Sequence, residues 1–160
     1  MACKLVVLLL SLLVIGCDRA PSNMLLQAKL VVSESIENEY DWAYIYFKGR
    51  ADDNDGEALF FLAAIDIKKC ISQDECDSDT ISLIERNLEA SHIKGYPLSS
   101  ALLEHAYRSG YLFGVIDPTK ADEIKRSFEE KVDAGVFEYP IDTYRNTSIK
   151  LLIREPKATP

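Results

Sequence analysis

The first seventeen residues constrain this chain most, because a positively charged start leads directly into an apolar run. Lys4 precedes the run, residues 5–15 are almost wholly apolar, and Gly16 and Cys17 close it. A positive start, a short apolar core and small residues before a cleavage point are typical of an export signal, which the mature protein loses. The run is also shorter than the roughly 20 residues of a membrane-spanning helix. We therefore expect residues 1–16 to be a cleaved signal peptide.

The end of this run, Val14-Ile15-Gly16-Cys17, resembles the lipobox of bacterial lipoproteins, although Val14 replaces the usual leucine. The resemblance implies that Cys17 carries a palmitate-type lipid and becomes the first residue of the mature chain. Asp18 resembles the signal that retains enterobacterial lipoproteins in the inner membrane. We therefore expect the mature protein to be anchored on the periplasmic face of the inner membrane, with anchoring in the outer membrane as the alternative. An ordinary signal peptide or a core helix is the alternative interpretation of the run.

The cysteines favour one short disulfide. Of the four cysteines in the chain, Cys3 leaves with the signal peptide and Cys17 carries the lipid, so that Cys70 and Cys76 remain. Two thiols at this separation in an oxidising periplasm are expected to pair. The loop between them is small, so the bond stabilises the fold by roughly 2 kcal/mol only. A metal site is disfavoured because no second cysteine or histidine pair lies nearby in the sequence.

Length and composition predict a single folded domain with an acidic surface. Hydrophobic residues make up 48% of the chain, which is enough to bury a core, and the formal net charge is -8. That charge disfavours nucleic acid and anionic lipid as ligands and permits a basic protein partner. We expect a lipidated tether over residues 17–22, a helical domain over 23–154 and a tail over 155–160.

Apolar residues recur at helical spacing through the mature chain, which predicts an all-α fold of antiparallel helix pairs. Glycine, proline and aspartate divide the pattern at positions typical of helix ends. The expected helices lie near residues 23–38, 41–48, 58–69, 81–88, 98–109 and 117–135. Residues 141–153 fit either a last helix or a short strand over 148–153, because the period alone does not distinguish the two.

Two segments share an order of a large apolar residue, a tyrosine four positions later, a glycine, a turn and an alanine that opens the next helix. Their defining positions are Tyr46, Gly49 and Ala58 in the first segment and Tyr107, Gly110, Asp117 and Ala121 in the second. The tyrosine can fill the groove between paired helices, while glycine allows the turn and aspartate caps the next helix. The order resembles the Sel-like subclass of tetratricopeptide repeats, which implies a short irregular solenoid. A generic helical bundle is the alternative.

No residue pattern indicates catalysis. His92 and His105 lack the spacing of a metal pair, and we expect the first at a helix end and the second facing solvent or a partner. The acidic turn fails the calcium-loop pattern, because Ala51 and Leu62 occupy its first and last ligand positions. Neither a serine elbow nor a phosphate-binding glycine loop occurs in the sequence. We therefore expect no cofactor, no metal and no enzymatic activity.

Binding to a protein is the role that remains, because helical-repeat domains bind proteins along a concave face and tyrosine is favoured at binding centres. The candidate binding residues are Tyr44, Asp52, Asp53, Arg108 and Tyr111. Small lipoproteins with Sel-like repeats resemble immunity proteins that guard bacteria against type VI secretion effectors, especially phospholipases. The resemblance implies that an acidic helical face occludes the effector. An envelope scaffold is the alternative, and an envelope hydrolase is a third hypothesis.

Overall fold

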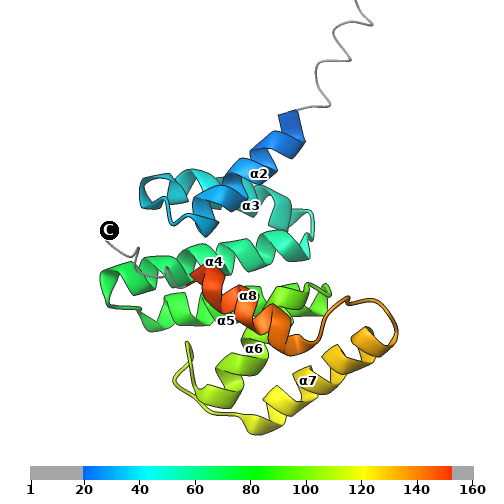
Figure 1. The fold of residues 1–160 in the computed structure, drawn as a ribbon. Helices are drawn as coiled ribbons and strands as arrows, with labels where there is room; N and C mark the ends of the chain where they lie inside the picture. Colours follow the sequence, from blue (N-terminus) through cyan, green and yellow to red (C-terminus); the bar gives the residue numbers. More distant parts are fainter. Residues whose placement is uncertain (1–19, 153–160) are drawn as a thin grey trace, which may run out of the picture.

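The computed structural model describes residues 20–152, and every regular element in that range is a helix (Figure 1). The prediction of an all-α fold is confirmed. The α-helices are α2 (Ala20–Ser33), α3 (Tyr40–Asp52), α4 (Gly56–Gln73), α5 (Ser78–Ile93), α6 (Pro97–Ser109), α7 (Pro118–Asp133) and α8 (Ile141–Leu152). A short 3-10 helix, η1 (Glu37–Glu39), joins α2 to α3. The predicted signal peptide, the lipid site at Cys17 and the tail lie outside the described residues.

The helices stack in the order of the chain. Each α-helix from α2 to α7 packs against the next one, and short connections make neighbours run antiparallel. Helix α8 departs from this order, because it turns back across the stack, packs mainly on α6 and also touches α2, α4 and α7 (Figure 1). The arrangement is a short, irregular solenoid with its last helix folded back over one face.

The core is centred on α4. Ten residues of this helix are buried, and those from Phe60 to Ile67 are buried without a break. The ring of Phe47 on α3 stacks on Phe61 at 4.8 Å between ring centroids, and Phe60 meets Tyr96 at 5.3 Å. A helix that is apolar on all sides has to be covered on all sides. This requirement places α2, α3, α5 and α8 around α4.

Capping residues set several helix ends, as the sequence predicts. Asp117 accepts a hydrogen bond from the Lys120 backbone N–H, and Pro118 occupies the first turn of α7. Gly110 ends α6 with a φ of 75°, a left-handed conformation that glycine adopts at little cost. The predicted structural roles of Asp117 and Gly110 are therefore confirmed.

The predicted role of Gly49 as a helix end is wrong. Helix α3 continues through it to Asp52. Arg50 and Ala51 both favour a helix. The chain turns only at Asn54, which has a φ of 69° and is one of the residue types that tolerate this conformation. Arg50 also forms an ion pair with Asp55 across the turn, which holds the longer helix in place.

Other boundaries also differ from the prediction. Helix α2 begins at Ala20 and ends at Ser33, because Ser35 has a φ of 55° and the chain turns into η1. Helix α4 runs on to Gln73, so that Cys70 lies within it. Residues 141–152 form a helix and not a strand. Its Ser148 hydroxyl is buried and donates to the Leu98 carbonyl of α6 at 3.0 Å.

A buried charge cluster fixes α8 to the stack. Glu104 on α6 is only 1% exposed, and its two carboxylate oxygens accept hydrogen bonds from Arg108 and Arg145 at 2.6 Å each. Arg145 belongs to α8, whereas Arg108 also binds Asp122 of α7 at 2.8 Å. A buried carboxylate is tolerated only with such partners. The cluster therefore joins α6, α7 and α8.

Replacing Glu104 by glutamine should lower the free energy of unfolding by about 3 kcal/mol, because a neutral amide leaves two guanidinium groups without their shared anion. Urea denaturation followed by circular dichroism measures the change. The matched control is Glu129→Gln on α7, where an exposed carboxylate lies 3.7 Å from Lys125. The control should leave the midpoint almost unchanged. Equal shifts for the two variants would contradict the role of the cluster.

Candidate functional site

The Cys70–Cys76 disulfide is confirmed, with a sulfur–sulfur distance of 2.05 Å. It joins the last turn of α4 to the loop before α5. Asp77 caps α5 by accepting hydrogen bonds from the backbone N–H groups of Asp79 and Thr80. The disulfide and the cap together hold this acidic connection in one conformation.

A cavity of about 260 Å³ opens beside this disulfide. We call it the disulfide pocket. Its walls come from α4, α5 and the loop after α6, and they consist of Ile67, Cys70, Ile71, Cys76, Ile81, Ile84, Tyr111 and Leu112. Asp74 and Glu75 complete the lining, and the side chain of Ile71 is 48% exposed. Concave, mostly apolar surfaces with a few polar groups are typical of binding sites.

The loop between α6 and α7 forms one wall of the disulfide pocket and carries unusual features of its own. Leu112 has a φ of 71°, which is uncommon for a bulky side chain and persists only where the surrounding structure fixes it. The ring of Phe113 meets that of Tyr107 at 5.3 Å and anchors the loop. Val115 and Ile116 are 61% and 66% exposed. The loop therefore presents apolar side chains to solvent.

The charges around the disulfide pocket are negative. Asp74 and Glu75 line it, Asp77 caps α5, Asp79 lies in the first turn of α5, and all four are exposed. Hydrogen bonds from Thr80 lower the pKa of Asp77, so its carboxylate is ionised near neutral pH. The residues that the structure places in the lining include no cation. Such a rim favours an apolar group flanked by lysine or arginine.

The structure does not bring the five predicted binding residues together. Tyr111 lines the disulfide pocket, and its ring lies 5.7 Å from that of His105. Arg108 is held by Glu104 and Asp122, as described above, so it has a structural role. Asp52 ends α3 and Asp53 follows it in the turn before α4; both are exposed, at the end of α4 remote from the pocket. Tyr44 is half-buried, and Lys69 lies 5.8 Å from its ring centroid.

The tyrosines of the repeat-like segments have structural contacts. The Tyr107 hydroxyl donates to Glu85 at 2.6 Å, and Lys120 donates to that hydroxyl at 2.6 Å, so the residue links α5, α6 and α7. Burial and the hydrogen bond to Glu85 raise the pKa of Tyr107 well above its usual value. Tyr46 is half-buried and stacks on Trp42 at 6.1 Å. Ala58 and Ala121 are fully buried, as close helix packing requires.

A second cavity of about 350 Å³ lies between α5 and α7. Its lining consists of Glu89, His92, Ile93, Leu103, Lys120, Glu123 and Ile124. Lys120 donates to Glu89 at 2.5 Å, and the Nδ1 atom of His92 lies 2.8 Å from the Ser100 hydroxyl. His92 lies at the end of α5, as predicted, and burial lowers its pKa. Because Glu89 and Lys120 bind each other and His92 binds Ser100, three of the polar side chains in the lining already have partners, which makes the second cavity the weaker candidate.

Sequence reasoning found Tyr111 but missed the aliphatic walls of the disulfide pocket. Ile71 is an apolar residue inside an otherwise polar cysteine loop, and this was the available signal for it. Helical periodicity assigns Ile81 to the core, because it does not distinguish an apolar face covered by another helix from one that borders a cavity.

Between residues 20 and 152, no group of three histidine, cysteine, aspartate or glutamate residues is placed to hold a metal ion. In the same range, no helix combines the length and the apolar character needed to cross a membrane.

Comparison of the chain with protein-family models, with curated proteins and with solved structures found no match.

Asp66 is a buried carboxylate in the middle of α4. It is 8% exposed, and its Oδ2 atom has no hydrogen-bond partner in the structure. Burial raises the pKa of Asp66 to about 6, and the nearby Lys69 opposes this only in part. The folded state therefore holds the proton more tightly than the unfolded state does. The resulting stability is present below about pH 4 and is lost as the pH rises through about 6.

Replacing Asp66 by asparagine should remove this pH dependence. At about pH 7.5 the variant should exceed the wild type in free energy of unfolding by about 1–2 kcal/mol, because partial solvent access screens the full effect. Near pH 3 the two proteins should differ little, since this pH lies below both the ordinary aspartate pKa and the raised pKa of the folded state, and Asp66 is then largely neutral in both states. Urea denaturation at a series of pH values measures the difference. A constant difference at every pH would contradict the assigned pKa.

Proposed function

We propose that this chain is a lipid-anchored periplasmic lipoprotein that binds and neutralises a protein partner, most concretely as an immunity protein against a type VI secretion effector of the phospholipase class. The observation that carries the proposal is the disulfide pocket, an apolar cavity with Asp74 and Glu75 in its lining. The signal-like start, the lipobox-like Cys17 and the repeat-like helix pairs support the class of protein.

Binding at the disulfide pocket follows from its construction. An apolar side chain of the partner enters between the walls that Ile71 and Tyr111 provide, and burial of apolar surface drives the step. Lysine or arginine residues beside that side chain meet Asp74 and Glu75. The disulfide and the adjacent caps hold the site before binding, so little ordering is required when the partner arrives.

The chemistry of the surface suits a partner that acts on lipids. Proteins that bind anionic membranes present basic residues together with apolar ones. An acidic rim around an apolar cavity is complementary to such a surface. Occupation of the partner's membrane-binding face neutralises it by steric exclusion, which requires no catalytic residue. A lipid at Cys17 raises the local concentration of the binding protein at the threatened membrane.

An envelope scaffold or assembly factor is the second candidate. The second cavity, between α5 and α7, favours the scaffold, because a scaffold needs more than one binding surface. The two functions predict different phenotypes when the gene is lost. An immunity protein protects against one toxic product, whereas loss of a scaffold causes a defect without any attacker.

The proposal predicts one toxic partner whose capture depends on the disulfide pocket. The tagged protein is cross-linked in the cell envelope, captured and analysed by mass spectrometry, with and without periplasmic expression of the neighbouring reading frame. Ile71→Asp and Tyr111→Ala should each lower affinity for the partner at least about tenfold and abolish protection, because both residues line the pocket. The matched control is Ile93→Asp, which alters a 77%-exposed side chain of the second cavity.

Three results would count against this function. Recovery of resident envelope proteins alone, with no protection against the neighbouring product, would favour the scaffold. Loss of binding in Ile93→Asp but not in Ile71→Asp would move the interface to the second cavity. A hydrolytic activity that survives removal of the partner would support the envelope hydrolase.

A further inference from the structure

Helix α2 exposes apolar side chains on the side that is not packed. Its inner face buries Ala28 and Val32, whereas Leu26 and Leu30 on the outer face are 57% and 46% exposed. Met24 lies one turn before Ala28 on the inner face and is 42% exposed. In Figure 1 the N-terminal end of α2 projects past the helices on which it packs. Helix α2 therefore presents exposed apolar side chains at the edge of an acidic domain.

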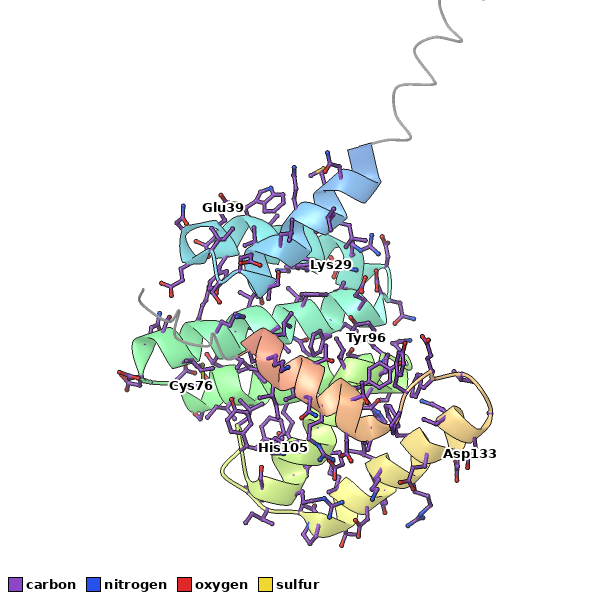
Figure 2. The ribbon with its side chains drawn as sticks, in the orientation of Figure 1. Lys29, Glu39, Cys76, Tyr96, His105 and Asp133 are labelled. Atoms are coloured by element: carbon purple, nitrogen blue, oxygen red, sulfur yellow. A yellow bond between two sulfur atoms is a disulfide. The ribbon has the colours of Figure 1, made fainter. Side chains whose placement is uncertain are left out.

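The charge of α2 differs from that of the rest of the chain. None of its fourteen residues is an aspartate or glutamate, although the whole chain has a formal net charge of -8. Its one charged side chain, Lys29, forms an ion pair with Glu57 of α4 at 2.8 Å (Figure 2). The outward face of α2 is thus uncharged. Such a face can enter the interface of a bilayer without the repulsion that carboxylates would cause.

The chain between Cys17 and α2 is short. Only Asp18 and Arg19 separate Cys17 from the first residue of the helix, and three peptide steps span at most about 10 Å. Met24 lies four helical residues further on, which adds about 6 Å. A lipid on Cys17 thus keeps Met24 within about 16 Å of the headgroup layer, whatever the direction of the connection.

We propose that α2 lies in the interface of the lipid bilayer and contacts it through the outer face that carries Leu26 and Leu30. The inference rests on the lipidation of Cys17 in the proposed function. It also orients the domain. Cys76, beside the disulfide pocket, lies at the left side of the body in Figure 2, away from the projecting end of α2. Insertion of α2 therefore leaves the pocket accessible to a partner that approaches the same membrane.

A tryptophan at position 26 tests this contact. The chain has one tryptophan, Trp42, so the variant combines Trp42→Phe with Leu26→Trp. The lipidated protein is reconstituted into phosphatidylcholine vesicles with brominated acyl chains. The emission should shift to the blue, and bromine should quench it at least about threefold more than in a control that combines Trp42→Phe with Val115→Trp. A Leu30→Trp variant in the same background provides an independent second position.

The mass of the N-terminal peptide shows whether Cys17 carries a lipid. It therefore separates a failure of the lipid anchor from a failure of the contact between α2 and the bilayer. A peptide without lipid at Cys17 would overturn both the anchor and the contact of α2 with the bilayer. Equal quenching at positions 26 and 115 in protein that carries the lipid would overturn this inference alone. A blue shift without quenching would also overturn it, because a protein surface or a second copy of the chain would then cover α2.

Discussion

The structure depends on the burial of α4. Its residues from Phe60 to Ile67, all apolar except Asp66, are buried without a break, so other helices must surround the helix. The stacked rings of Phe47 and Phe61 join it to α3, and the packing of α5 covers the opposite side. The helix that turns back, α8, adds the remaining cover and is fixed by the buried Glu104 cluster.

The candidate site follows from the way in which α4 ends. Its last turn extends beyond the fully covered part, so Ile71 becomes exposed just where the disulfide bends the chain towards α5. The loop after α6 then supplies Tyr111 and Leu112 from the other side. An apolar cavity with an acidic rim results from an incompletely covered helix end. The same fold leaves Leu26 and Leu30 exposed on the outer face of α2.

Features encoded locally could be predicted from the sequence, and those that need tertiary contacts could not. Asp117 and Gly110 determine helix ends through their own backbone and side-chain preferences, so their roles follow from the sequence. The prediction that Gly49 ends its helix was wrong, because a glycine can lie within a helix when the following residues favour one. The buried Glu104 cluster and the walls of the disulfide pocket join residues distant in the chain, and no periodicity reveals such contacts.

The central claim, that the disulfide pocket is the surface that meets a protein partner, is tested most directly by photo-cross-linking in living cells. A benzophenone amino acid replaces Ile71 in one strain and Ile93 in another, since the two exposed isoleucines belong to different cavities. The account predicts one dominant cross-linked protein from position 71 and little from position 93. Cross-linking from position 93 alone, or from neither position in cells that contain the partner, would contradict it.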